Sequence, residues 1–202
     1  MERTAPETWR IAVLTSGHGR GSNLRALHRY FQENKLLIRI CFATASDASA
    51  PVVELCRKLG VPCHVLKPRP RAEFERLLVD LCREEGADLI ALAGFMSLLS
   101  DEFISEVRIP ILNIHPALLP KYGGRGMYGM KVHEAVFNSG EDISGASVHI
   151  VDPIYDHGKV IAREEVDITD CRSPSEVAEK VLKAEHRIYA PAIYNYLRKH
   201  HQ

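Results

Sequence analysis

The sequence predicts an α/β protein with a doubly wound, mostly parallel β-sheet. Short apolar runs alternate with segments of helical periodicity through the first half of the chain, and the connections between them are short. The run at 88–93 is almost entirely apolar, which is typical of a strand buried on both faces at the centre of a parallel sheet. The alternation ends near residue 116, so we expect a different arrangement beyond it.

Five strands are predicted in the first half, each from a short run of apolar residues. They span 11–14, 36–43, 61–66, 88–93 and 109–114. The first two intervening helices carry their own start signals. Ser22 is a suitable N-cap for a helix at 23–31. Pro51 suits the first position of a helix at 51–59, and Gly60 ends it.

The third helix is predicted from periodicity. Apolar residues recur with helical spacing over 71–85, and Gly86 follows as a stop. Ser100 is expected to cap a short helix before the fifth strand. These helices connect successive parallel strands and therefore flank the sheet.

The second half starts with a glycine-containing loop at 116–130 and a short helix at 131–138. Two further apolar runs, 144–151 and 160–168, are separated by a turn and predict an antiparallel extension of the sheet. A long helix should then run from Ser173 to about Arg198, with a bend near Pro191.

Together these elements predict a single Rossmann-like α/β domain over residues 1–202. We expect about seven strands, flanking helices, an antiparallel C-terminal extension and a flexible tail at 1–9.

Composition excludes several classes of protein. The 202 residues include 26 Lys plus Arg and 26 Asp plus Glu, and this balance argues against a general binder of nucleic acid or membrane surfaces. With 46% hydrophobic residues the chain is not disordered, and no apolar run approaches the roughly 18 residues of a membrane span. The five cysteines are scattered and never form a Cys-x-x-Cys pair, so we expect free, buried thiols and a cytoplasmic protein without a signal peptide.

The glycine-rich segment 17–21 follows the first strand, where open parallel sheets bind ligands. Glycines let backbone N–H groups approach an anion, and the helix beginning near Ser22 adds its positive end. A tight turn with structural glycines is the alternative. A dinucleotide site is less favoured because the spacing is G-x-G-x-G.

Asn113 and His115 end the fifth predicted strand and point to the same side because they are two positions apart. An amide can hold an oxyanion and an imidazole can move a proton. Asp156, in the turn after residue 151, is a potential third partner that would raise the pKa of His115. Two polar groups satisfied by backbone atoms remain the alternative.

The other histidines give weaker signals. His149 fits a core or supporting position, whereas His18, His133 and His157 lie in or near segments expected to be mobile. No metal site is predicted, because the chain has neither a His-x-x-x-His helix nor clustered Cys and His residues.

Several segments in order along the chain resemble phosphoribosylglycinamide formyltransferases. The resemblance covers about residues 10–197, and its segments are Ser16-Gly17, Gly21-Ser22-Asn23-Leu24, Leu92-Ala93-Gly94-Phe95-Met96, Leu112 to Tyr122, Gly145 to His149, Asp156-His157-Gly158 and Glu185 to Tyr189. The Asn-x-His-Pro-x-Leu-Leu-Pro segment marks the wider formyltransferase superfamily. We expect neither the extra C-terminal domain of methionyl-tRNA formyltransferases nor the N-terminal regulatory domain of formyltetrahydrofolate deformylases.

The resemblance implies transfer of a formyl group from 10-formyltetrahydrofolate to the amine of glycinamide ribonucleotide in purine biosynthesis, directly and without metal. It assigns catalysis to Asn113, His115 and Asp156. It assigns the substrate phosphate to Gly21, Ser22 and Asn23, and the glycinamide end to Glu185. It assigns the folate to Arg71, Met96, Ser97, Leu98, Leu99 and Asn113, with the 151–156 loop.

The implied partners are small molecules only, with no nucleic acid or membrane, and the implied state is a monomer or homodimer. Three alternatives stay open: another amine acceptor, hydrolysis of 10-formyltetrahydrofolate, and a binding module without catalysis. The chain also departs from the family pattern. Its 17–21 loop is two residues longer, Ser97 stands where the family often has arginine, and the longer loop at 123–131 is either a lid or an insert.

Overall fold

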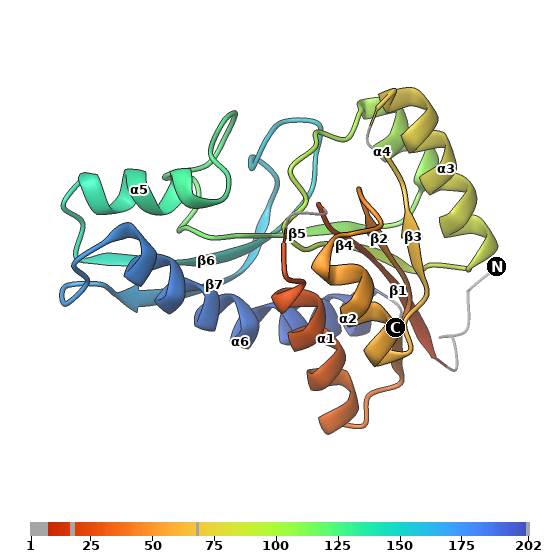
Figure 1. The fold of residues 1–202 in the computed structure, drawn as a ribbon, viewed down its shortest axis with the longest axis horizontal. Coiled ribbons are helices and arrows are strands. Elements are labelled where there is room, and N and C mark those ends of the chain that lie inside the picture. Colours follow the sequence, from red (N-terminus) through yellow and green to blue (C-terminus); the bar gives the residue numbers. More distant parts are fainter. Residues whose placement is uncertain (1–7, 17–18, 68, 201–202) are drawn as a thin grey trace.

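The computed structural model describes residues 8–16, 19–67 and 69–200, and within them it contains one seven-stranded sheet flanked by six helices (Figure 1). The strands are β1 Trp9–Leu14, β2 Ile38–Ala45, β3 Cys63–Val65, β4 Leu89–Leu92, β5 Ile111–His115, β6 Ile143–Ile150 and β7 Val160–Asp167. The helices are α1 Ser22–Glu33, α2 Pro51–Leu59, α3 Arg71–Glu84, α4 Asp101–Val107, α5 Met130–Asn138 and α6 Pro174–His200.

The strand order is β3-β2-β1-β4-β5-β6-β7. The first five strands pair in parallel, whereas β6 and β7 add antiparallel strands beside β5. This mixed, mostly parallel α/β sheet confirms the predicted fold class. The order reverses between β1 and β4, so the loops after these strands diverge there and leave room for a ligand.

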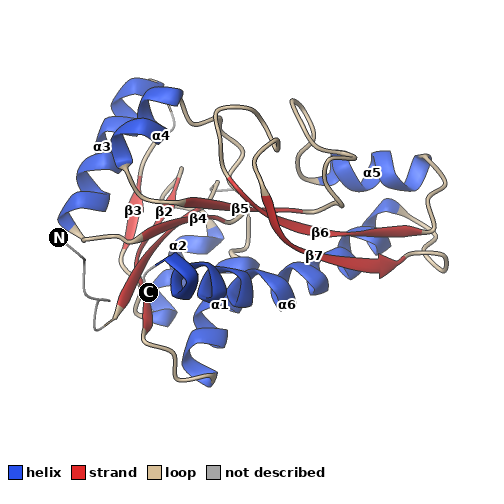
Figure 2. Cartoon of the chain, turned by 180° about the vertical axis from the view of Figure 1, so that it is seen from behind, coloured by secondary structure: helices blue, strands red, loops and turns tan. Residues whose placement is uncertain are grey.

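Helices cover both faces of the parallel half of the sheet. Figures 1 and 2 show α3 and α4 on one face and α1, α2 and α6 on the other. In β1, Ile11 and Val13 pack into the core under α1, α2 and α6, whereas Ala12 and Leu14 pack into the core under α3 and α4. Because both faces are buried, β1 is a continuous apolar run without polar alternation.

The first helix differs from the prediction at its start. Ser22 lies in the first turn of α1, and the N-cap is Gly21, which has a left-handed backbone (φ 69°) and no side-chain capping bond. A Cβ atom at Gly21 would lie 2.7 Å from Leu55 Cδ2 in α2. The close packing of α1 against α2 therefore requires a glycine where capping preference alone favoured a serine.

Other boundaries shift for local reasons. Trp9, which we predicted in the flexible tail, belongs to β1: its N–H donates to Leu37 O at 2.9 Å, and its ring packs edge-on against Tyr194. Residues 1–7, with Gly17 and His18, lie outside the described residues. Leu36 donates its N–H to Phe31 O and completes the end of α1, so β2 begins two residues later than predicted.

Several predicted signals are confirmed. Pro51 opens α2 and Gly60 ends it in a left-handed conformation. The Ser100 side chain accepts the Phe103 N–H and caps α4. α6 continues through Pro191 to His200, and the bend predicted there stays a prediction. All five cysteines are free, and four are buried, with Cys63 only partly so. In the described part of the chain, every helix is too short or too polar to cross a membrane.

Candidate active site

A cavity of about 290 Å³ opens where β1, β4 and β5 end, beneath the 116–129 and 151–159 loops. Most of the predicted site residues line it, namely Asn23, Met96, Ser97, Leu98, Leu99, Asn113, His115, Asp156 and Glu185. Gly21 and Ser22 are outside the lining and precede Asn23 at the start of α1. Arg71 is also outside it: its exposed guanidinium lies 3.9 Å from Glu75 at the start of α3.

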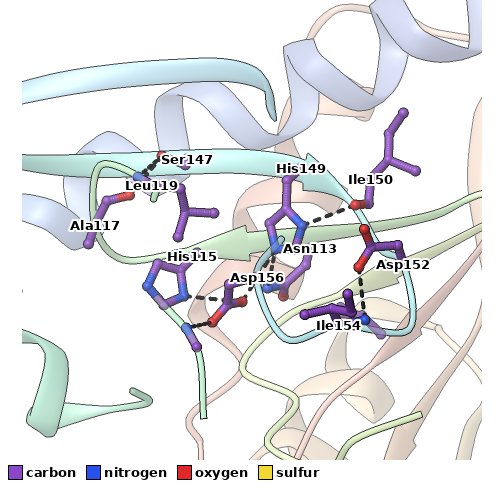
Figure 3. A network of polar contacts seen from close by, with 12 residues as sticks. Asn113, His115, Ala117, Leu119, Ser147, His149, Ile150, Asp152, Ile154 and Asp156 are labelled. Carbon is purple, nitrogen blue, oxygen red and sulfur yellow. Dashed lines mark hydrogen bonds and ion pairs between the residues drawn. The ribbon is translucent and has the colours of Figure 1, made fainter. Parts of the chain in front are cut away.

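Asn113, His115 and Asp156 meet at one point of this cavity (Figure 3). Asn113 and His115 project from the same side of β5, as strand alternation predicts. Asp156 follows β6 and places Oδ1 at 3.6 Å from His115 Nδ1. The same oxygen lies 3.5 Å from Nε2 of His149, so the carboxylate stands between two imidazole rings.

His149 enters the cluster because β6 pairs with β5 so that His149 lies opposite Asn113. The Asn113 amide Nδ2 lies 3.0 Å from His149 Nε2. Sequence analysis placed His149 only in the core or in support of the site. The position of His149 opposite Asn113 depends on the pairing register of β5 and β6. The periodicity of a single strand does not reveal that register.

The loops around the cluster are fixed by specific contacts. The Gly124 N–H donates to Asp156 Oδ2 at 2.9 Å and joins the two loops over the cavity. A Cβ atom on Gly123 would lie 2.5 Å from Leu119 Cδ2 and 3.1 Å from Asp156 Cβ, so a larger residue there would displace the Leu119 side chain and press on Asp156. On the strand paired with β5, the buried Ser147, opposite His115, donates its hydroxyl to Ala117 O at 2.7 Å and accepts the Leu119 N–H at 3.1 Å (Figure 3).

The partners of the two imidazoles determine their neutral tautomers. His115 Nε2 lies 2.8 Å from Tyr122 O, a carbonyl that only accepts, so Nε2 carries the proton. His149 Nδ1 lies 3.1 Å from Ile150 O and is protonated for the same reason. His149 Nε2 then accepts the Asn113 amide N–H. His115 Nδ1 is left facing the Asp156 carboxylate and bonds to it well only when His115 is protonated.

Burial decides the protonation of His115 in the empty site. Burial lowers the pKa of His115 below its usual value, and this effect outweighs the opposing influence of Asp156 and of the Tyr122 carbonyl. Asp156 thus acts on the His115 pKa in the direction expected from the sequence, but burial makes the net change a lowering. Burial favours the neutral form of Asp156 too, but the adjacent imidazoles of His149 and His115 and the Gly124 N–H together hold its pKa below the usual value. An ionised carboxylate thus faces a largely neutral imidazole at neutral pH.

A second polar pair lies at another part of the cavity. Asn23 Nδ2 donates to Glu185 Oε2 at 2.6 Å, across 162 positions of sequence. Burial raises the pKa of Glu185 to about 7, with the Asn23 hydrogen bond opposing this effect. Asn23 Oδ1 is enclosed without a partner. One N–H of the Asn23 amide is thus directed at Glu185, and the predicted role of Asn23 toward a phosphate stays a prediction.

The remaining lining is largely apolar and forms an exposed rim. Met96, Tyr128, Ile154 and Tyr155 are the exposed large apolar residues of the cavity. Ser16 Oγ accepts the Met96 N–H at 2.8 Å and ties the loop after β1 to the loop after β4. An apolar cavity with a few convergent polar groups is the usual form of a small-molecule site.

His133 is a further lining residue that sequence analysis missed. It is buried on α5 between Val132 and Val136, and not in a mobile segment as expected. The helical spacing of the two buried valines was the available signal for a buried face. The glycines before the helix favoured a mobile loop instead.

Comparison with known proteins identifies the class of this fold and site. A model of the formyl transferase family matches residues 9–193, so the chain belongs to the formyl transferase family. It is similar in particular to proteins named phosphoribosylglycinamide formyltransferase. The chain is 34% identical over 184 residues to the one from Escherichia coli (strain K12), covering 89% of this chain and 82% of that protein.

Other comparisons agree. The chain is 35% identical over 192 residues to the chloroplastic phosphoribosylglycinamide formyltransferase of Arabidopsis thaliana, covering 93% of this chain. It spans 65% of the length of that relative and 59% of the corresponding protein of Vigna unguiculata. The crystal structure of glycinamide ribonucleotide transformylase 1 from Symbiobacterium toebii matches with a TM-score of 0.86 at 29% identity, covering 96% of this chain and 89% of that chain.

Proposed function

We propose that this protein transfers a formyl group from 10-formyltetrahydrofolate to the amine of N1-(5-phospho-D-ribosyl)glycinamide, a step of purine biosynthesis. The observation that carries this proposal is the cluster of Asn113, His115 and Asp156, with one carboxylate oxygen 3.6 Å from His115 Nδ1 in an otherwise largely apolar cavity. The similarity to phosphoribosylglycinamide formyltransferases supports the choice of substrates.

The acceptor substrate is proposed to bind toward α1 and α6. The phosphate would take the backbone N–H groups at the start of α1, where Gly21 and Ser22 let an anion approach the positive helix end. Glu185 would receive the glycinamide end, because a carboxylate can accept hydrogen bonds from an amino group. Asn23 would orient Glu185 through the bond that it already donates.

The folate is proposed to bind toward the apolar rim. The segment Met96–Leu99 and the loop that contains Ile154 would enclose its ring system, with backbone atoms of Ser97 in place of an arginine contact. Phe95 stacks on Phe74 of α3, with ring centroids 6.1 Å apart, and supports this wall from behind. Arg71, at the exposed start of α3, would meet the anionic tail of the folate outside the cavity.

The proposed reaction is a direct acyl transfer. The amine nitrogen forms a bond to the formyl carbon, and the bond from that carbon to the folate nitrogen breaks. The amine loses a proton and the folate nitrogen gains one, so formylated amine and tetrahydrofolate are the products. Negative charge develops on the formyl oxygen between these steps, and hydrogen-bond donors must meet it there.

Asn113 and His115 are proposed to supply those donors. Asn113 uses one amide N–H on His149, and its second N–H remains for the oxyanion. His115 Nε2–H, which donates to Tyr122 O in this structure, is the other donor. As charge develops, the ionised Asp156 favours the imidazolium form of His115. Asp156 also lies where it can pass protons, through water, between the amine and the leaving nitrogen.

Release of tetrahydrofolate with and without glycinamide ribonucleotide tests the proposal. We expect release to depend on the acceptor and to match formation of the formylated amine one to one. Release that ignores the acceptor would identify a 10-formyltetrahydrofolate hydrolase. Release that requires a different amine would retain the formyl transfer and change the acceptor, and binding of both ligands without any release would leave only a binding module.

A further inference from the structure

His133 has no role in the mechanism above, yet it lies in the same cavity. It lines the cavity from α5, and its residue surface is only 6% exposed. Its Nδ1 atom is enclosed without a hydrogen-bond partner. Buried polar atoms of native proteins are nearly always paired, so the enclosed and unpaired Nδ1 constrains which nitrogen of this ring carries the proton.

The imidazole of His133 is uncharged under ordinary conditions. Burial, together with the smaller influence of the nearby His115, lowers its pKa to about 4. A neutral imidazole has one N–H and one bare nitrogen. An enclosed N–H without an acceptor is more costly than an enclosed bare nitrogen, so the proton belongs on Nε2 rather than on the unpartnered Nδ1.

The helix that carries His133 belongs to the acceptor side of the cavity. α5 packs against α6, which carries Glu185, and α6 packs against α1, which carries Asn23. α3, beside the proposed folate wall, packs against α4 instead. His133 therefore belongs to the same group of packed helices as the Asn23–Glu185 pair, and the influence of His115 on the His133 pKa places His133 near the reacting groups as well.

We propose that His133 contacts the amine-bearing substrate and donates a hydrogen bond from Nε2 to the carbonyl oxygen beside the reacting amine. This inference rests on the proposed function and deepens it. In glycinamide the carbonyl carbon is separated from the amine nitrogen by one methylene group, so a donor on the carbonyl also fixes the direction of the amine. An uncharged donor suits this task because, unlike a carboxylate, it does not stabilise the protonated and non-nucleophilic form of the amine.

The test compares three substitutions at one position. Glutamine places an amide N–H where Nε2 lies, asparagine places it where Nδ1 lies, and leucine removes the donor. Calorimetric titration of each protein with glycinamide ribonucleotide measures binding without turnover. We expect His133→Leu and His133→Asn to bind about tenfold more weakly, as for the loss of one hydrogen bond, and His133→Gln to bind nearly as well as the wild type. The KM for glycinamide ribonucleotide should rise in parallel, and the KM for 10-formyltetrahydrofolate should not change.

The comparison of glutamine with asparagine decides the result, because both place a polar amide in the same buried space and disturb folding alike. Equal binding by all variants, or better binding by asparagine than by glutamine, would overturn the inference. A rise in the folate KM alone would also overturn it. A wild-type protein that fails to bind glycinamide ribonucleotide would refute the proposed function itself, whereas wild-type binding with unaltered variants would refute only the role of His133.

Discussion

His115 Nδ1 lies 3.6 Å from Asp156 Oδ1, in a pocket where burial and charge act on the imidazole in opposite directions. Burial lowers the pKa of His115, and the carboxylate restores part of the loss. Asp156 is itself held by the Gly124 N–H, so its charge is fixed in position before any ligand arrives. When negative charge also develops in the cavity, that charge and the pre-oriented carboxylate together favour the imidazolium form of His115.

Substitution of either partner should lower turnover strongly. We expect His115→Ala and Asp156→Asn to reduce kcat by at least ~100-fold, the usual size of a general acid–base effect, with much smaller changes in ligand binding. Steady-state kinetics and calorimetric binding of each substrate provide the measurement. His157→Ala is the control, because this neighbouring histidine is exposed and pairs with Asp152 at the surface. Full activity in either cluster variant would refute the proposed mechanism.

Local sequence patterns predict one half of this cluster and not the other. Asn113 and His115 follow from strand alternation, since two residues of one strand that are two positions apart face the same side. The position of Asp156 depends on the antiparallel pairing of β5 and β6, which brings the following loop back over β5. No local periodicity reports that register. For Asp156, the resemblance to a known family therefore added what the residue pattern alone left open.

Positions that involve two distant elements were the hardest to predict. Capping preference selects Ser22, but the contact between α1 and α2 requires the left-handed Gly21 at the cap. Asn23 was grouped with its sequence neighbours, whereas its side chain bonds to Glu185 on the last helix. Packing between distant elements decides both cases. The propensity of a single segment carries no information about that packing.

Glu185 should make stability depend on pH in a defined window. Its pKa is about 7 in the folded protein, against 4.5 for the ordinary carboxyl, so folding favours the protonated form. The stabilisation is complete below pH 4.5 and is lost as the pH rises through about 7. At 1.36 kcal/mol for each pKa unit, this difference between the two pKa values corresponds to about 3 kcal/mol in the free energy of unfolding.

Glu185→Gln should remove this dependence, because an amide does not titrate and still offers an oxygen to Asn23. We expect the variant to match the wild type near pH 4 and to exceed it in free energy of unfolding at pH 8. Urea denaturation at several pH values checks this. Parallel pH curves for the two proteins would contradict the prediction.

The N-cap of α1 offers a matched test of close packing. Gly21 and Gly60 have nearly the same left-handed backbone, with φ of 69° and 67°. A Cβ atom at Gly60 meets no atom within 4 Å, whereas one at Gly21 would lie 2.7 Å from Leu55 Cδ2. Gly60→Ala should cost about 1 kcal/mol for the backbone alone, and Gly21→Ala about 1–3 kcal/mol more. Thermal unfolding of both variants measures the difference, and equal losses would show that α1 shifts to accommodate the methyl group.

The phenol of Tyr189 joins the last helix to the two strands that end at the cavity. Its hydroxyl lies 2.9 Å from the carbonyl oxygens of both Leu92 and Leu112, and the side chain is fully buried. Tyr189→Phe keeps the ring and removes the hydroxyl that reaches these carbonyls from α6. We expect a loss of about 1–2 kcal/mol in the free energy of unfolding, the usual cost of a buried hydrogen bond, measured by denaturant titration.

Tyr194→Phe, on the same helix, serves as a control. The Tyr194 ring packs against Trp9, and because Tyr194 is partly exposed, water can occupy the place of its hydroxyl group. Leu92 precedes the Met96–Leu99 wall and Leu112 adjoins Asn113. The Tyr189 variant should therefore also lower kcat modestly. A loss of stability as large in the Tyr194 variant would attribute the effect to the helix rather than to this bond.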